Sequence, residues 1–542
     1  MIQEPISFDR LRSPPSHSFD VIVIGAGTGG LTTAALLARR GKKVLVLDQH
    51  TVPGGNATVF PRSGYRFDVG LHYLGGCDAN GLIPRILRAA GTEPVLFEEM
   101  DPDGFDTLLF PDFSFRVPKG IEAFRERLRE GFPAEERGID RYCTLLRALE
   151  RLLRRSANPA ALLWTLLRSP LLLRWAKGSF RGFLQACTTD IWLQAVLAAQ
   201  HGNYALPPSR ASLLIGAGIA EHYLEGAYFP RGGGQILSDR LAQAVEAAGG
   251  RILLRSRAQQ ILTRNGRAIG VRFENPNLGL QEVEAPSIVS NADVKQTFLR
   301  LVPEGELRLR VLKRVEGWEM APALFVVYLG ARRSALGGKE ARTNYWVHST
   351  YDHEVQYRQA ARGEFPDAPS VFVSVSSLKD PTSEGLAPEG FVNLQLMAVC
   401  PSQPEAWGLS AEEAAGSAYR RKTLYRERKE KFGKKLIELA RRAFPHLPEQ
   451  IVYQELSSPF THSRYTLSTG GTGYGIAATP EQFLLGRPGA RTELPGLLLC
   501  GASCRTGHGI AGAMMSGLMA ASAILGPRLL RAVFGKTNRI PL

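Results

Sequence analysis

The sequence predicts an α/β fold built on a parallel sheet with helices on both faces. Three observations lead to this fold class. The chain opens with an apolar strand, a glycine-rich turn, a helix and a second strand. Alternating strands and helices return after residue 226, and a strand, a glycine-rich turn and a helix close the chain. With 542 residues, we expect two or three lobes rather than one core.

The opening unit is a strand–helix–strand unit with short connections. Phe19 to Ile24 reads FDVIVI, a buried-strand pattern, and Leu31 to Arg40 has the periodicity of a helix. Lys43 to Leu47, KVLVL, is a second strand. Such a crossover leaves the two strands parallel and adjacent, as at the start of a doubly wound sheet.

The middle of the chain differs in composition. Residues 116–225 are rich in Leu, Arg, Trp and Ala and are expected to be helical. Their most apolar stretch, 161–177, is flanked by Trp164 and Trp175, which fits either a buried helical hairpin or a helix pair in a membrane interface. Residues 419–444 predict a long charged helix with a solvated face. The predicted domains are 1–115, 226–300 and 446–542 for the cofactor-binding domain, 116–225 for a helical lid, and 301–445 for a mixed α/β substrate domain.

Composition and charge restrict the class of partner. Hydrophobic residues make up 44% and charged residues 22%, as in ordinary globular proteins. A formal net charge of +15 attracts anionic partners, either nucleic acid or a membrane face. The arginines are scattered and no zinc-finger or RNA-binding signature occurs, so we expect no nucleic-acid partner. The absence of G-x-S-x-G, H-E-x-x-H and P-loop motifs argues against hydrolases and NTPases.

The cysteines and the N-terminal residues bear on location. No C-x-x-C pair occurs, so we expect reduced thiols and no metal site. The first twenty residues are polar and do not form a secretory signal, and no apolar run is long enough to cross a bilayer. A cytoplasmic protein, at most peripheral on a membrane, is the expectation.

The turn after the first strand carries a dinucleotide-binding motif. Gly25 permits the tight turn, Gly27 lets the backbone approach a pyrophosphate, and Gly30 lets the helix pack against the strand. The N-terminus of the helix faces the phosphates. Asp48, which ends the second strand, is placed to accept hydrogen bonds from a ribose. The turn residues predicted to bind the cofactor are Gly25, Gly27, Thr28, Gly29 and Gly30.

A second glycine turn distinguishes between cofactors. Gly54 and Gly55, followed by Asn56, come soon after Asp48. NAD dehydrogenases need no such turn there, whereas FAD enzymes use it to pass the chain under the pyrophosphate. The predicted cofactor is therefore FAD.

Three blocks resemble the flavoprotein superfamily of phytoene desaturases, carotenoid isomerases and retinol saturases. Residues 49–76, ending FDVGLHYLGG, are most similar to the retinol saturase branch; residues 226–293 and 494–521 resemble later family segments. The family acid is usually Glu, whereas this chain has Asp48, and residues 301–445 match only loosely. The resemblance adds to the predicted cofactor site Ala258, Asn291, Gly501, Ala502, Ile510, Ala511, Gly512 and Ala513.

The resemblance implies a two-lobed, Rossmann-like FAD fold of the glutathione-reductase and amine-oxidase type, with a discontinuous FAD domain. It implies an oxidoreductase that saturates or desaturates carbon–carbon bonds of a long conjugated isoprenoid by hydride transfer at flavin N5. NAD(P)H or another external donor or acceptor would exchange electrons with FAD. The alternatives are a carotenoid cis–trans isomerase without net redox change, an amine oxidase, and a lipid carrier in which FAD is structural.

Candidate proton donors follow from the same resemblance. His72 and Tyr73 in GLHYLGG, and His508 in the C-terminal turn, are the candidate catalytic residues, with a packing role as the alternative for each. Tyr465 and Tyr474 are expected to line the pocket. The segment 213–223, LLIGAGIAEHY, imitates a second dinucleotide turn but lacks its third glycine, so we expect a helix of the lid there.

Overall fold

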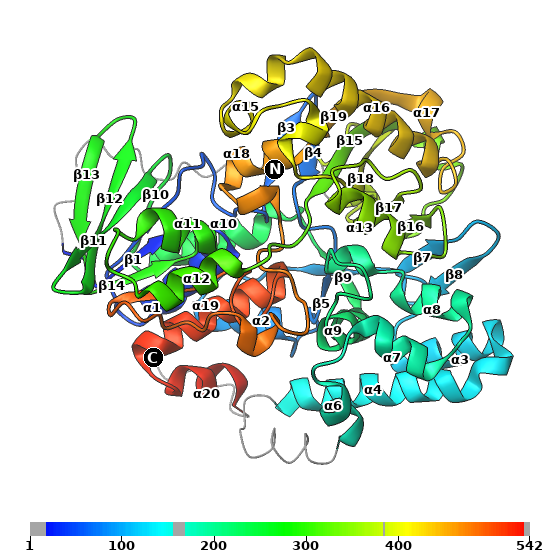
Figure 1. The fold of residues 1–542 in the computed structure, drawn as a ribbon, viewed down its shortest axis with the longest axis horizontal. Coiled ribbons are helices and arrows are strands. Elements are labelled where there is room, and N and C mark those ends of the chain that lie inside the picture. The colour runs from blue at the N-terminus through cyan, green and yellow to red at the C-terminus, as the bar shows by residue number, and fades with distance from the viewer. Residues whose placement is uncertain (1–17, 156–168, 383–384, 536–542) are drawn as a thin grey trace.

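The computed structural model describes residues 18–155, 169–382 and 385–535. Figure 1 shows three regions: a parallel sheet with its helices, a second large sheet, and a group of helices beside that sheet. The predicted two-lobed α/β fold with a helical lid is confirmed. Part of the 161–177 stretch, including Trp164, lies outside the described residues.

The parallel sheet assembles strands from distant parts of the chain. Its order is β10 (Arg251–Leu253), β2 (Val44–Leu47), β1 (Val21–Ile24), β14 (Ser287–Ser290) and β20 (Leu497–Leu499), and every pairing is parallel. Because parallel strands align their carboxyl ends, the turns after β1, β14 and β20 meet at one edge. The cofactor domain is therefore discontinuous in sequence and continuous in space.

Each face of this sheet has its own cover. Val21 and Val23 of β1 point to α1 (Thr28–Ala38), α10 (Gln235–Ala247) and α19 (Gly509–Leu525). Ile22 and Ile24 point to the opposite face, where the antiparallel sheet β11 (Arg257–Arg264), β12 (Arg267–Asn275) and β13 (Gly279–Glu284) packs with α12 (Leu309–Gly317). Apolar residues on both sides of β1 explain the continuous apolar pattern of FDVIVI.

The second sheet has seven strands and crosses the predicted domain boundaries. Its order is β19 (Ile451–Ser457), β15 (Leu324–Arg332), β18 (Phe391–Val399), β17 (Ser370–Ser374), β16 (Asn344–His348), β7 (Asp106–Leu109) and β8 (Ser114–Val117). Strand β7 pairs in parallel with β16, although more than 200 residues separate them. The substrate lobe therefore includes strands on both sides of 301–445, at 106–117 and 451–457, because strand pairing rather than sequence proximity builds the sheet.

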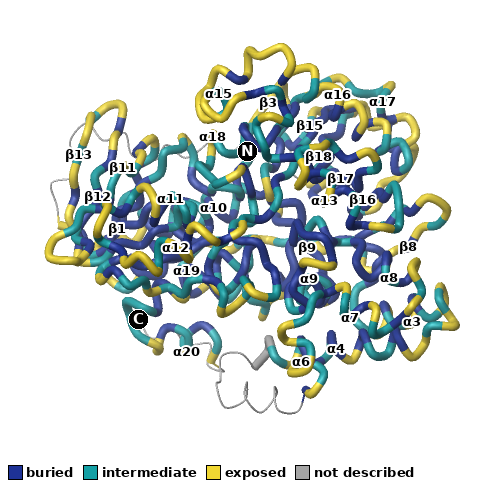
Figure 2. The backbone as a smooth tube through the Cα atoms, in the orientation of Figure 1, coloured by how far each residue is buried: buried dark blue, intermediate teal, exposed yellow. Residues whose placement is uncertain are grey.

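The outer face of the seven-stranded sheet is covered by α16 (Thr423–Ala440) and α17 (Leu447–Gln450). Helix α16 buries Tyr425, Phe432 and Leu436 and exposes its charged residues (Figure 2), so the predicted solvated face is present. The 3-10 turn Ala418–Arg421 precedes it, so the predicted single helix begins later than expected.

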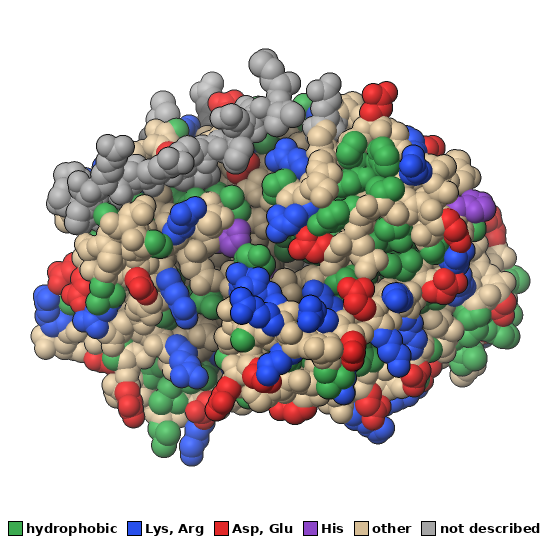
Figure 3. Space-filling view, turned by 90° about the horizontal axis from the view of Figure 1, so that it is seen from above, with side chains coloured by type: hydrophobic (Ala, Val, Ile, Leu, Met, Phe, Trp, Pro, Cys, Tyr) green, Lys and Arg blue, Asp and Glu red, His purple; other side chains and the backbone are tan. Residues whose placement is uncertain are grey.

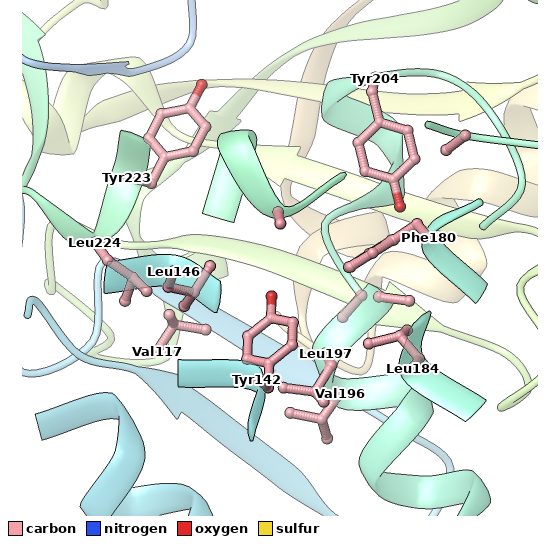
Figure 4. Close-up of a cluster of buried hydrophobic side chains, with 14 of the residues drawn as sticks. Val117, Tyr142, Leu146, Phe180, Leu184, Val196, Leu197, Tyr204, Tyr223 and Leu224 are labelled. Atoms are coloured by element: carbon pink, nitrogen blue, oxygen red, sulfur yellow. The ribbon is translucent and has the colours of Figure 1, made fainter. Parts of the chain in front are cut away.

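The helical region packs against the other end of the sheet. It contains α3 (Ile121–Gly131), α4 (Glu136–Arg155), α6 (Pro170–Trp175), α7 (Phe180–Cys187), α8 (Ile191–Ala198) and α9 (Leu213–Leu224). Figure 4 shows its core, in which side chains of α4, α7, α8 and α9 meet around Tyr142 and Leu197. In the described part of the chain, no helix is both long and apolar enough to cross a bilayer.

Candidate functional site

One cavity of about 950 Å³ runs between the parallel sheet and the seven-stranded sheet. Its lining comes from the turns that follow β1, β2 and β14, from the segment around Gly54, and from strands β15, β18 and β19. Exposed arginines Arg62, Arg257 and Arg300 lie in its wall, and basic side chains gather across the middle of the face seen from above in Figure 3. These exposed arginines in the wall favour an anionic cofactor.

The end of the cavity beside the parallel sheet fits a dinucleotide. Helix α1 begins after Gly27 without any side-chain cap, so its first N–H groups are free to face a phosphate. Asp48 accepts hydrogen bonds from the N–H of Ala26 at 2.6 Å and of His50 at 2.7 Å, which fix its carboxylate at the cavity wall. Burial raises the pKa of Asp48, and these two N–H groups act in the opposite direction.

Glycine is required where this end is narrowest. A Cβ on Gly29 would lie 2.7 Å from Oδ1 of Asn291 and 3.0 Å from N of Gly501. Gly54 has φ +130° and forms a parallel bridge with Gly27, so the second glycine turn lies beside the first. The two turns provide the close backbone approach that FAD requires, and the described residues fit this cofactor.

The remaining predicted cofactor residues divide into two groups. Asn56, Ala258, Asn291, Gly501, Ala502, Ile510 and Ala513 line the cavity together with Gly25, Gly27, Thr28, Gly29, Asp48, Gly54 and Gly55. Gly30, Ala511 and Gly512 do not line it. A Cβ on Gly30 would lie 2.1 Å from O of Gly25 and 3.2 Å from Cγ1 of Val23, so this glycine lets the helix pack against the strand and contributes no cavity surface. Helix α19 begins after His508 without a side-chain cap, with Gly509 and Ile510 in the cavity wall.

The end beside the seven-stranded sheet is mainly apolar. Leu324 and Val326 of β15, Met397 of β18 and Leu456 of β19 line it. Tyr328 and Tyr474 also line the cavity. Tyr465, which was predicted to do so, lines it beside His50 and is 45% exposed. An elongated apolar molecule could therefore lie between the sheet and a cofactor bound at the other end.

His72 lies in the wall of this cavity above a buried lysine. The imidazole is 8% exposed, and neither ring nitrogen has a hydrogen-bond partner. The backbone carbonyl oxygen of His72 accepts a hydrogen bond from Nζ of Lys379 at 2.7 Å, and the same Nζ donates to Oγ of Ser374. Burial, together with the Lys379 charge, lowers the pKa of His72 to about 3. The ring is neutral near pH 7 and offers one N–H donor and one acceptor.

Lys379 is buried between two carboxylates. Burial lowers the pKa of Lys379 to about 7, whereas Asp106 and Asp68 act to raise it. Burial raises the pKa of each carboxyl, Asp68 and Asp106, to about 6. No functional role was predicted from the sequence for Asp68, Asp106 or Lys379, and only the approach of β4 (Tyr65–Asp68), β7 and α14 (Ser376–Lys379) brings them together.

Tyr73 and His508 lie behind the cavity wall. The Tyr73 hydroxyl donates to Asp106 at 3.1 Å and accepts from Asn203, and its ring stacks on Tyr223 at 3.9 Å. Nε2 of His508 lies 3.0 Å from the carbonyl oxygen of Asn203, and burial lowers the pKa of His508 to about 3. Neither side chain lines the cavity, so of the three candidate proton donors the structure places only His72 at its wall.

His462 is a cavity residue that the sequence did not indicate. Its Nε2 lies 2.7 Å from Oδ1 of Asn56, and its Nδ1 lies 2.8 Å from the carbonyl oxygen of Gly471. Both contacts fix the glycine-rich segment 470–475, which contains Gly471, against the second glycine turn. A histidine in THSRY carries no recognisable spacing, so only the fold reveals this role.

The segment 213–223 forms a helix, as predicted. Gly216 and Gly218 lie inside α9, whose first turn is capped by the Ser212 hydroxyl. A Cβ on Gly216 would meet the ring of Phe180 at 2.6 Å, so this glycine allows α9 to pack on α7. The pair does not form a turn after a strand and does not resemble a second dinucleotide site.

The fold and the site define an FAD-dependent oxidoreductase. Residues 23–90 match the family model described as NAD(P)-binding Rossmann-like domain, and residues 413–525 match the one described as flavin containing amine oxidoreductase. A crystal structure of an oxidoreductase from Methanosarcina mazei is similar in fold, with a TM-score of 0.61 at 16% identity over 93% of this chain and 99% of that chain.

Two curated relatives extend over nearly the whole chain. The human all-trans-retinol 13,14-reductase is 29% identical over 97% of this chain and 88% of its own length. The chloroplastic prolycopene isomerase of Daucus carota is 28% identical over 94% of this chain and 80% of its own length. The resemblance seen in the motifs is thereby confirmed: over nearly its whole length, the chain is similar to a retinol reductase and to a prolycopene isomerase.

Replacing Asp48 by Ala is expected to weaken FAD binding. The variant loses the carboxylate that accepts two backbone N–H bonds and faces the ribose position, a loss of about 1.5–3 kcal/mol or roughly 10–100-fold in affinity. FAD content and a fluorescence titration of the apoprotein measure it. Asp20→Ala is the matched control, because Asp20 accepts the N–H of Lys43 at the far end of the same strands. Equal affinities in both variants would contradict the assignment.

The buried Lys379 predicts a pH-dependent stability. Its pKa is about 7 in the folded chain and near 10.5 when exposed, so the unfolded chain binds the proton more tightly between these values. The free energy of unfolding of the wild type should therefore rise with pH across this window relative to that of Lys379→Met. The corresponding rise in Tm is a few degrees. Thermal unfolding at pH 7 to 10 measures the difference, with Lys431→Met on α16 as the exposed control. A difference that is flat across this pH range contradicts the shifted pKa.

Proposed function

We propose that the chain transfers hydride to or from a carbon–carbon bond of a long conjugated isoprenoid, either a retinoid or a carotenoid. The observation that carries this proposal is the single cavity that joins a dinucleotide cradle to an apolar wall of β15, β18 and β19. Relatives named for retinol reduction and prolycopene isomerisation support the same substrate class.

FAD, when bound, supplies hydride transfer and electron storage. The residues of the chain orient the substrate and exclude water. Leu324, Val326 and Met397 present an apolar surface on which a polyene would lie and from which it would displace water. His72 offers the hydrogen-bond donor at this wall, as a neutral N–H rather than a stored imidazolium proton.

An isomerase without net redox change is the second candidate, supported by the similarity to the Daucus carota protein. The apolar wall serves both reactions, so product mass separates them. An amine oxidase has less support from the cavity. Among the described lining residues, the carboxylate nearest the apolar end is Glu455, and Arg62 at 3.2 Å and the Tyr453 hydroxyl at 2.7 Å already engage it.

We propose NAD(P)H or another external donor as the source of electrons, docking at the cavity entrance without a Rossmann domain of its own. The exposed arginines in the cavity wall would attract an anionic donor.

We also propose a cytoplasmic location. All six cysteines lie among the described residues and all are free, which suits a reducing compartment.

We propose in addition that the helical region meets a lipid surface. Leu173 on α6 is 51% exposed, and Ile191 and Trp192 on α8 are 62% and 49% exposed. Arg174 directly follows Leu173 in the chain, and Lys177 comes three residues after Arg174. Apolar and aromatic side chains with basic neighbours fit the interface of an anionic membrane, from which an apolar substrate would come.

The substrate proposal is tested by photoreducing the FAD of the purified protein without oxygen and adding all-trans-retinol or a carotene. We expect the flavin band to recover and the product to gain two hydrogens. A changed isomer at unchanged mass would identify the isomerase reaction. No change with any polyene, together with bleaching of oxidised flavin by putrescine or another amine, would overturn the substrate class.

The membrane proposal is tested by flotation with vesicles that contain anionic lipid, at low and high salt. We expect the wild type to float at low salt and to be partly released at high salt, because screening weakens the basic contribution. The double variant Leu173→Ser, Trp192→Ser should float less, and Leu485→Ser, which alters an exposed leucine elsewhere, should not. Wild-type protein that stays at the bottom of the gradient at low salt would contradict the proposal.

A further inference from the structure

Three buried histidines lie together behind the cavity. His201 begins the short turn that follows α8, His348 ends β16, and His353 precedes α13 (Glu354–Ala361). They are 2%, 0% and 4% exposed, and one ring nitrogen of each lies within 4.8 Å of the other two. The ring centroid of His353 lies 4.7 Å from that of His201 and 4.7 Å from that of His348.

Each ring is held on one side by a hydrogen bond. Nδ1 of His201 lies 2.8 Å from the Tyr357 hydroxyl, and Nδ1 of His348 lies 2.9 Å from Oγ of Ser370. Nε2 of His353 lies 2.9 Å from the carbonyl oxygen of Ala195. Such a partner on the far nitrogen is what orients metal-binding histidines and fixes the nitrogen that carries the lone pair.

The opposite nitrogens are not accounted for by contacts within the protein. Nε2 of His348 and Nδ1 of His353 have no hydrogen-bond partner, although both are buried. Nε2 of His201 has one contact, to the amide nitrogen of Gln356 at 3.3 Å. Buried polar atoms are rarely left unpaired, so packing of three aromatic rings does not explain why one nitrogen of each ring lies within 4.8 Å of the other two.

We propose that His201, His348 and His353 bind a divalent first-row metal ion of the zinc type, with a water molecule as the fourth ligand. Three neutral imidazoles are a donor set that such ions prefer over Mg²⁺ or Ca²⁺. Nitrogens bound to one tetrahedral Zn²⁺ lie about 3.4 Å apart, so the widest pair, which is at most 4.8 Å apart, must close by at most about 1.4 Å through rotation of the rings. Asp352, next to His353, supplies negative charge near the site, whereas Arg442 donates to the carbonyl oxygen of His348.

The ion would join the helical region to the seven-stranded sheet. His201 belongs to the turn His201–Asn203, and the other two ligands belong to the sheet and to the helix that follows it. The carbonyl oxygen of Gly202 accepts the Tyr474 hydroxyl at 2.9 Å, and Asn203 binds both Tyr73 and His508. Metal binding at His201 therefore stabilises the turn His201–Asn203, which holds the cavity-lining residue Tyr474.

The proposal is tested by metal analysis of tag-free protein and by its reconstitution. We expect stoichiometric Zn²⁺ in the purified protein or, after chelation, uptake of Zn²⁺ with a rise in Tm. Co²⁺ added to the chelated protein should give the intense visible bands of a four-coordinate site. Wild-type protein that neither retains Zn²⁺, gains Tm with it, nor shows these Co²⁺ bands overturns the proposal, whatever the variants do.

Variants locate the site. His348→Gln and His353→Gln should each lose the Co²⁺ bands and the Zn²⁺-dependent rise in Tm while retaining FAD absorbance, because the cofactor cradle lies elsewhere. His446→Gln, which changes an exposed histidine, should behave as the wild type. Undiminished Co²⁺ bands in both cluster variants would overturn the assignment, since the ion would then bind at another place. These readouts do not depend on catalysis, so they stand apart from the substrate proposal.

Discussion

The structure depends on how closely three turns approach one another at the carboxyl ends of β1, β14 and β20. Asn291 lies between the glycines of the first turn and Gly501 of the last, and a Cβ on Gly501 would lie 2.8 Å from its Oδ1. Helix α19 crosses α1 where a Cβ on Gly517 would lie 2.3 Å from O of Gly29. Because no side chain fits at these crossings, the N-termini of both helices reach the same cavity.

The second lobe buries polar groups beneath the apolar wall of the cavity. Asp106 accepts hydrogen bonds from Tyr73, Gln200 and Asn344. Nζ of Lys379 donates a hydrogen bond to the backbone carbonyl oxygen of His72. Charged groups at this depth are costly unless they are paired and hydrogen-bonded. The network therefore fixes the turn that carries His72 without placing a charge in the apolar part of the cavity.

The motifs of the sequence were local, and the residues they marked are those whose role is set by backbone geometry. Gly25, Gly27 and Asp48 act within one strand–turn–helix unit, so spacing alone placed them at the cavity. Tyr73 and His508 were predicted from their segments, yet Tyr73 lies just before β5 (Leu74–Gly75) and His508 is the N-cap residue of α19, where packing sets the direction of the side chain. The structure turns both toward Asn203 and away from the cavity lining.

The sequence by itself determined the glycine-rich dinucleotide turns, the opening strands of the parallel sheet and the family resemblance, because each depends on residues close together in the chain. Only the tertiary structure decided which strands complete the second sheet, which of the candidate proton donors lines the cavity, and that His201 meets His348 and His353. These are contacts between segments more than a hundred residues apart. Strand pairing and packing set them, and no local spacing encodes them.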